Sequence, residues 1–297
     1  MIEKISSAVD RVGRIGDGSV STPAGSVTVG VVGRHVLLGT LTLLVVSPLL
    51  LALLMSTQTR AEIYQPGYLL PGSAGLENYQ RALFDFQFGL YLLNSLIMSI
   101  IVVIGKVGLA LIAALALVYY RIPYKNGIFI FILLTLTFPV PVRIVPLFDM
   151  MVSVGWTNSM LALTIPYFAS ATALFIFRQH FLSIPDSLTE AARLDGVGPL
   201  KFLREVVIPM SSGMIAGVSV ITFIYTWHQY LWPLVIIEDD ANQVVVVGIK
   251  LLEGSQWSGQ VEWGVIMAGS ILAVLPPLVV LILLRKPLLQ AFGVQQK

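Results

Sequence analysis

The loop from Ser183 to Pro209 reads S-I-P-D-S-L-T-E-A-A-R-L-D-G-V-G-P-L-K-F-L-R-E-V-V-I-P and joins two strongly apolar stretches of the chain. Pro185 interrupts the helix that precedes it. Ser187 is followed three residues later by Glu190, which is the spacing of a capping box at a helix start. The first half of the loop therefore predicts a short helix over about residues 188–194.

The second half of the loop begins with Gly196 and Gly198, which predict a sharp turn. We expect a side chain in place of the Gly196 hydrogen to clash at this turn. Pro199 suits the first turn of a second helix. Apolar residues then recur at spacings of three and four, which give that helix one apolar side: Phe202, Leu203, Val206 and Val207.

The composition is that of an integral membrane protein. Of the 297 residues, 56% are hydrophobic and only 11% are charged, and the mean hydropathy is +0.86. A helix needs about 20 apolar residues to cross a bilayer. Six stretches qualify: roughly Val36 to Met55, Leu92 to Val118, Gly127 to Phe148, Met160 to Phe181, Met214 to Ile237 and Val265 to Leu284. We predict an all-α integral membrane protein with six transmembrane helices.

Positive charge is distributed unequally over this predicted topology. If the amino terminus is placed inside, 13 of the 18 Lys and Arg residues are cytoplasmic, which is the bias typical of membrane proteins. The loops left outside, around residues 57–91 and 238–262, are rich in acidic residues. We therefore predict that both termini are cytoplasmic. The net charge of +2 says nothing about nucleic acid, and no nucleic-acid partner is expected.

These features divide the chain into four segments. Residues 1–33 form a cytoplasmic extension, and residues 34–90 form the first transmembrane helix and an external loop. Residues 91–285 form the transmembrane core that contains the loop at 183–209, and residues 286–297 form a cytoplasmic tail. The chain has no cysteine, which excludes disulfides and thiolate metal sites.

Two cations inside apolar spans are candidates for function. Lys106 lies near the middle of the second predicted span, and Arg143 lies among Pro139, Pro141 and Pro146 in the third. A cation at the bilayer centre costs about 2.5 to 3.5 kcal/mol on insertion scales, so it usually faces a cavity or a partner. Both cations are therefore candidates for binding an anionic solute. The alternatives are that Lys106 extends along its helix toward the membrane surface and that Arg143 lies among the outer headgroups.

The fifth predicted span contains F-I-Y-T-W-H-Q-Y-L-W-P-L over residues 223–234. Aromatic faces beside amide and hydroxyl groups can hold a polyol or sugar by stacking and hydrogen bonding. The candidate residues are Trp227, His228, Gln229, Tyr230 and Trp232. An aromatic belt at the membrane surface explains the tryptophans and Tyr230 equally well.

The sequence lacks the signatures of an ATPase or a metalloenzyme. Lys106 follows a glycine, but Ile100 and Val107 stand where a phosphate loop needs Gly and Ser or Thr. The three histidines are far apart in sequence, so no metal site is expected. No internal repeat is visible, whereas a secondary transporter usually has two related halves. Six spans make one half at most, so we expect a second membrane subunit.

From about residue 92 to residue 285, the order of these features resembles the permease subunits of type-1 ATP-binding-cassette importers of the carbohydrate-uptake family. The loop carries most of this resemblance, because Glu190-Ala191-Ala192 is followed by Gly196 after three residues and by Val206-x-Ile208-Pro209 after nine more. Within the family, the proline-rich and aromatic segments and Val247-Gly248-Ile249-Lys250 are most similar to permeases of sn-glycerol-3-phosphate importers. His228 departs from this pattern, since such permeases often have a small polar residue there.

The resemblance implies a type-1 permease fold in which the loop helix is a coupling helix that contacts an ATPase. Its coupling residues would be Glu190, Ala191, Ala192, Asp195, Gly196 and Pro209. The chain would be a non-catalytic subunit without a cofactor, because ATP is bound by a partner. The complex would contain two different permeases, two ATPase copies and an external solute-binding protein, in a prokaryotic plasma membrane.

The resemblance also implies a transport mechanism, alternating access, for sn-glycerol-3-phosphate or a related polyol phosphate. An alternative in the same class is a permease for a neutral sugar or oligosaccharide. An alternative in another class is a self-contained secondary transporter or channel, which would need no ATPase.

Overall fold

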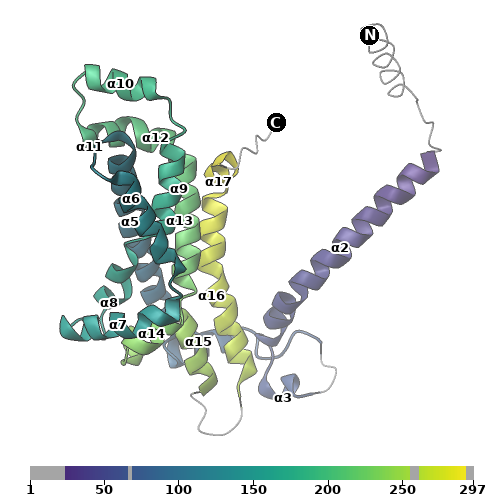
Figure 1. Cartoon of the computed structure of the whole chain (residues 1–297). Coiled ribbons are helices and arrows are strands. Elements are labelled where there is room, and N and C mark those ends of the chain that lie inside the picture. The colour runs from purple at the N-terminus through teal and green to yellow at the C-terminus, as the bar shows by residue number, and fades with distance from the viewer. Residues whose placement is uncertain (1–23, 66–68, 255–260, 292–297) are drawn as a thin grey trace. The chain divides into compact units, whose positions relative to one another are not determined.

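The computed structural model describes residues 24–65, 69–254 and 261–291, and all regular structure in these ranges is helical (Figure 1). The α-helices are α2 (Ala24–Met55), α3 (Arg60–Ile63), α4 (Glu77–Gln80), α5 (Phe88–Tyr119), α6 (Lys125–Leu134), α7 (Val140–Ser153), α8 (Met160–Thr164), α9 (Ala171–Phe181), α10 (Asp186–Leu194), α11 (Pro199–Phe202), α12 (Ile208–Met210), α13 (Ser212–Trp227), α14 (Leu231–Ile236), α15 (Val245–Gly254), α16 (Trp263–Leu283) and α17 (Arg285–Ala291). Short 3₁₀ or π turns lie between them: η1 (Arg81–Asp85), η2 (Thr135–Thr137), η3 (Ile165–Tyr167), η4 (Leu203–Val207) and η5 (Asp240–Asn242).

The chain divides into two compact units, one ending at Leu51 and the other beginning at Ala52. The first unit contains most of α2, whose large apolar side chains from Val32 onward are mostly exposed. Such a helix is suited to face lipid or another apolar surface. The predicted amino-terminal extension and carboxy-terminal tail lie partly outside the described residues.

In the second unit, α5 is the central helix of a bundle. Helices α9 and α13 pack along α5, and α15 and α16 also contact it. The Phe168 ring packs closely on α5 at Gly105, where an added Cβ would lie 2.5 Å from its ring carbons. Because a methyl group cannot fit at that distance, glycine sets the spacing between α5 and the segment after η3.

Within the described ranges, three helical segments are individually long and apolar enough to cross a membrane: Val32–Met55, Phe88–Tyr119 and Trp263–Leu283. Three further candidate spans are bent pairs of helices: Lys125–Thr137 with Pro141–Ser153 at 104°, Met160–Tyr167 with Ala171–Phe181 at 40°, and Pro199–Met210 with Ser212–Trp227 at 84°. If each bent pair is one span, these segments account for up to six spans, as the sequence predicts.

The prolines of the third and fifth predicted spans indicate breaks in these helices, and both spans are interrupted in the structure. Extended backbone at Pro139, with φ −59° and ψ 144°, separates the two parts of the third. In the fifth, α13 ends at Trp227 and α14 begins at Leu231. Pro233 has no N–H for the carbonyl of Gln229 one turn earlier, which favours this break.

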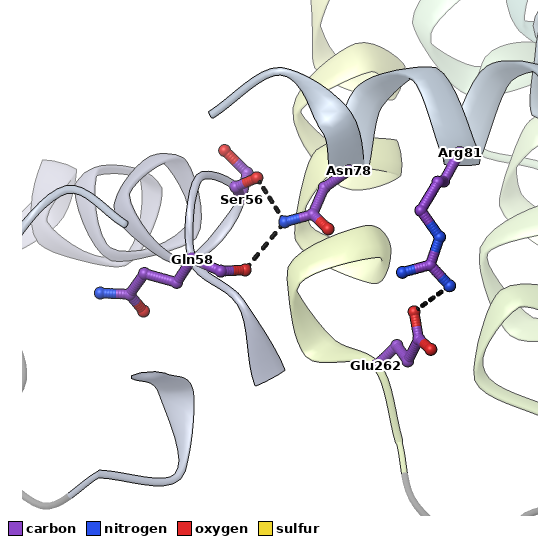
Figure 2. Close-up of polar contacts among 5 residues, drawn as sticks. All are labelled: Ser56, Gln58, Asn78, Arg81 and Glu262. Atoms are coloured by element: carbon purple, nitrogen blue, oxygen red, sulfur yellow. Dashed lines mark hydrogen bonds and ion pairs between the residues drawn. The ribbon is translucent and has the colours of Figure 1, made fainter. Parts of the chain in front are cut away.

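At the end of the bundle opposite α10, Asn78 joins three segments of the second unit (Figure 2). Its buried amide donates to the carbonyls of Ser56 at 3.0 Å and Gln58 at 2.9 Å. Arg81 forms an ion pair with Glu262 at 2.5 Å, beside the start of α16. A small cleft is lined by Gln58, Asn78, Arg81 and Glu262, and a Cβ added at Gly264 would lie 2.6 Å from the Asn78 amide nitrogen. This junction therefore fixes the loop after α2 against α4 and α16.

Replacing Asn78 with leucine keeps the side-chain volume but removes both hydrogen bonds. We expect Asn78→Leu to lower the free energy of unfolding by about 1–3 kcal/mol, because a buried pair of carbonyls loses its donor. Thermal unfolding of the purified protein in detergent measures the effect. Glu77→Gln, at the exposed neighbouring position, is the control. Equal melting temperatures for the two variants would contradict this role of Asn78.

Glu62 stabilises the same loop after α2 in a pH-dependent manner. The backbone N–H of Thr59 donates to the Glu62 carboxylate at 2.7 Å, and that of Ser73 donates at 3.1 Å. These bonds, that of Thr59 foremost, lower the pKa of Glu62 from 4.5 to about 2. Since the pKa is lower in the folded chain, the stabilisation is complete above pH 4.5 and is lost as the pH falls toward 2.

We therefore expect the backbone amides of Thr59 and Ser73 to lose protection from hydrogen exchange between these two pH values, relative to their intrinsic exchange rates. The control is Glu62→Gln, whose amide oxygen can still accept these bonds but does not titrate, so its protection should not change with pH. Protection in the natural chain that does not change with pH would rule out this role for the Glu62 carboxylate.

Candidate functional site

The helix α10 lies at one end of the bundle and exposes one complete face (Figure 1). On its inner side Thr189 is buried, and Leu188 and Ala192 pack against the apolar core below. On its outer side Glu190 and Ala191 are exposed, and Leu194 is 89% exposed. A leucine this exposed at the end of a rigid helix is suited to contact a partner.

The predicted capping box at the start of α10 was wrong. The helix begins at Asp186, its N-cap residue is Pro185, and no side chain caps it. Pro185 has φ −58° and ψ 133°, so the chain enters the helix directly after the proline. Ser187 therefore already lies in the first turn, where it cannot serve as the N-cap residue. Asp186 lies in the same turn, where a negative charge is favourable.

A left-handed residue, Gly196, ends α10. Its φ is +65°, its N–H bonds the carbonyl of Arg193 at 3.2 Å, and the N–H of Val197 bonds the carbonyl of Ala192 at 2.9 Å. This pair of bonds is a Schellman motif, which favours glycine. The expected steric clash was wrong, because a Cβ at Gly196 would meet no atom within 4 Å. The requirement for glycine comes from the backbone conformation.

A network around Tyr119, at the end of α5, connects α10 to the bundle. The Arg193 guanidinium donates to the Tyr119 carbonyl at 2.9 Å, and the Tyr119 hydroxyl donates to the Phe181 carbonyl at 3.1 Å. The Tyr119 ring also contacts that of Phe202 edge to face, with 5.3 Å between ring centroids. Tyr119 therefore connects α5, α9 and both helices of the loop.

The sequence analysis missed Tyr119. The available signal was Tyr119-Tyr120 at the end of a long apolar run, because a buried tyrosine hydroxyl needs a hydrogen-bond partner. The partners themselves lie 62 and 74 residues away in sequence, so local spacing does not indicate them.

The second helix of the loop packs its apolar side inward, as predicted. Phe202, Leu203 and Val207 are buried in the core below α10. The helix widens to a π turn at η4, directly before the exposed Pro209. Proline has no N–H to donate one turn back, and such widening is a common local adjustment.

Lys106 lies inside the bundle and is only 8% exposed. Its Nζ atom lies 5.7 Å from the centroid of the Tyr225 ring. No acidic side chain pairs with it in the part of the chain that the structure describes. Arg143, by contrast, is exposed on α7. The two candidate cations therefore lie in different surroundings, Lys106 inside the bundle and Arg143 on its surface.

The aromatic segment separates into buried and open residues. Trp227 and Trp232 are each 2% exposed, and their indole N–H groups donate to the carbonyls of Ala273 and Ala162 at 3.1 and 2.9 Å. Both tryptophans therefore lie in the packed interior.

The remaining candidate residues of this segment lie in the break between α13 and α14. His228 is exposed, and its Nδ1 atom lies 2.8 Å from the Ile224 carbonyl. Tyr230 is half-buried beside the core. Both polar atoms of the Gln229 amide are buried without a hydrogen-bond partner in the described chain. Within the described ranges, no group of three or more His, Asp or Glu side chains is placed to hold a metal ion.

Comparisons with known proteins assign this chain to a family. The model of the family described as "Binding-protein-dependent transport system inner membrane component" matches residues 106–291, which include α10, its turn and the helices that flank it. Similar proteins include the sn-glycerol-3-phosphate transport system permease protein UgpE of Pectobacterium atrosepticum, which is 40% identical over 259 residues that make up 85% of this chain and 92% of that protein. The UgpE protein of Salmonella typhi is 40% identical over 246 residues, 80% of this chain and 87% of its own.

The fold is also similar to that of a solved structure. A chain from a bacterial ABC transporter involved in the import of the acidic polysaccharide alginate superposes with a TM-score of 0.77 at 24% identity, over 89% of this chain and 98% of that chain. This similarity supports the all-helical type-1 permease fold. Together, the family match, the relatives and the fold identify a multi-pass inner membrane protein that performs no catalysis itself. The chain belongs to the family of binding-protein-dependent transport system inner membrane components, the permease subunits of ATP-binding-cassette importers.

Proposed function

We propose that this chain is one of two different permease subunits of an importer for sn-glycerol-3-phosphate or a related polyol phosphate. The observation that carries this proposal is the 40% identity to UgpE permeases over 85% of this chain and 92% of the relative. A cation held inside the bundle at Lys106 agrees with an anionic solute.

The proposed assembly contains a second permease, two copies of an ATPase and an external solute-binding protein. The exposed face of α10 is the proposed ATPase contact, with Glu190, Ala191, Ala192 and Asp195 on the helix and its end and Gly196 and Pro209 shaping the loop. Both termini and α10 are then cytoplasmic, and the junction at Asn78 faces the binding protein's side.

In this mechanism ATP binding draws the two ATPases together, and each coupling helix moves with its ATPase. The Arg193–Tyr119 hydrogen bond transmits the movement from α10 to α5, while the peptide chain itself transmits it to α9 and α13. The two permeases then open to alternate sides of the membrane. Moving a two-state protein from 1:99 to 99:1 requires about 5.5 kcal/mol of differential binding, which ATP and the loaded binding protein supply together.

The test is transport by the assembled complex in proteoliposomes, with this chain, the second permease, the ATPase and the binding protein from one genome. We expect ATP-dependent uptake of sn-glycerol-3-phosphate and none of maltose. Uptake of maltose alone would favour a neutral-sugar permease. Uptake by this chain alone, driven by an ion gradient, would overturn the assignment in favour of a secondary transporter.

The turn at Gly196 gives a prediction with a matched pair of variants. A non-glycine residue in the left-handed region costs about 1–2 kcal/mol, so Gly196→Ala should reduce uptake about fivefold or more. Gly196→Asn should retain more uptake, because asparagine tolerates this conformation better. Equal uptake by both variants and the natural chain would contradict the requirement for this turn.

The Arg193–Tyr119 hydrogen bond gives a prediction about coupling. Arg193→Gln removes the charged donor, so we expect the amount of ATP hydrolysed per solute imported to rise about threefold or more. The control is Arg121→Gln, an exposed arginine at the same end of the bundle. Measurement of hydrolysis and uptake in the same vesicles gives the ratio. An unchanged ratio for Arg193→Gln would show that α10 transmits its movement without this bond.

A further inference from the structure

The position of Lys106 needs a physical explanation that the coupling mechanism does not supply. It is 8% exposed, lies in the middle of α5, and has no acidic partner among the described residues. An ammonium group in such surroundings is costly unless an opposite charge compensates it. In the described chain, the contact that its charged end makes is with the face of the Tyr225 ring.

Tyr225 forms the boundary between this buried cation and the open surface of the bundle. Its side chain is 53% exposed, although the next two residues of α13, Thr226 and Trp227, are buried. A ring face attracts an ammonium group more weakly than a phosphate does, because phosphate carries full negative charge and accepts charge-assisted hydrogen bonds. An anion that reaches this position therefore interacts more strongly with Lys106 than the Tyr225 ring does.

Unsatisfied polar groups lie on the same two helices and in the break that follows α13. Ser99 precedes Lys106 by two helical turns, about 10 Å along α5, and Thr226 and Gln229 follow Tyr225. The side-chain polar atoms of these three residues are buried without hydrogen-bond partners in the described chain. Because α5 ends and α13 begins near the coupling loop, the two helices are antiparallel, and all three residues lie toward the end opposite α10. Buried polar groups without partners are uncommon in proteins and call for an explanation such as a polar ligand.

We propose that Lys106 and Tyr225 form a binding site for the anionic group of the transported solute, of the phosphate monoester class. In this proposal the Lys106 ammonium leaves the Tyr225 ring to pair with the phosphate. The unpartnered amide of Gln229, four residues after Tyr225, hydrogen-bonds hydroxyl groups of the same solute. This inference rests on the proposed function, and it adds that this subunit itself contacts the solute.

The site also has a direct structural connection to the coupling loop. Lys106 and Tyr119 lie on the same helix, 13 residues or about 20 Å apart. Tyr225 lies on α13, which follows the coupling loop in the chain. A movement of α5 relative to α13 changes the distance between Lys106 and Tyr225, so occupancy of the site and the position of α10 are linked.

The test compares Lys106→Met with Lys106→Arg in the complete transporter in proteoliposomes. Methionine keeps the length and apolar stem of lysine and removes the charge, so it should insert and assemble normally. We expect Lys106→Met to lower uptake of sn-glycerol-3-phosphate about tenfold or more, while Lys106→Arg retains part of it. The control is Lys250→Met, which makes the same change at an exposed lysine of α15 and should transport as the natural chain does.

A second measurement separates solute binding from a structural role. ATP hydrolysis stimulated by the loaded binding protein should persist in Lys106→Met, because the coupling loop and ATPase contact are unchanged. Loss of both stimulation and uptake would show that Lys106 supports assembly, and would overturn the site. Wild-type uptake by Lys106→Met would also overturn the site and leave the proposed function intact. If the natural chain imports no phosphorylated solute, the proposed function fails, and the site fails with it.

Discussion

The structure depends on one constraint, which is that every backbone N–H and C=O group at membrane depth needs a partner within the protein. Helices meet this requirement locally, and helical structure accounts for all regular elements in the ranges that the structure describes. The interruptions are therefore informative. They fall at Pro139, at residues 228–230 and at the sharp bend before α13. The first lies one helical turn before Arg143, and the second contains Gln229. The third lies where the loop at residues 183–209 returns to the bundle.

Features set by local spacing were predictable from the sequence. The helix before Gly196, the turn at that glycine and the inward side of the next helix depend on residues within about one turn of each other, and each was predicted. The start of α10 was predicted two residues late, because a proline can start a helix without a capping side chain. The breaks in the third and fifth spans were indicated by Pro139 and Pro233, because proline cannot donate a backbone hydrogen bond inside a helix.

Contacts between distant segments were not predictable from a single sequence. The bonds of Tyr119 to Phe181 and Arg193 join residues more than 60 positions apart. Trp227 and Trp232 illustrate the same limit. In the sequence they fit either an aromatic belt at the membrane surface or a solute pathway, whereas in the structure their indole N–H groups donate to carbonyls of other helices inside the bundle. Lys106 is the opposite case. Its position in an apolar span was enough to predict that its charge is energetically costly there, and the structure adds Tyr225 as its neighbour.

The exposed end of the loop at residues 183–209 has a consequence for biogenesis. Leu194 is 89% exposed and Leu200, just beyond the turn, is 69% exposed. Two exposed leucines on adjoining short helices form a small apolar surface, and such surfaces promote non-specific association when no partner covers them. In the proposed assembly, newly inserted subunits are therefore most prone to unwanted association before an ATPase covers these leucines, which favours binding of the ATPase early in assembly.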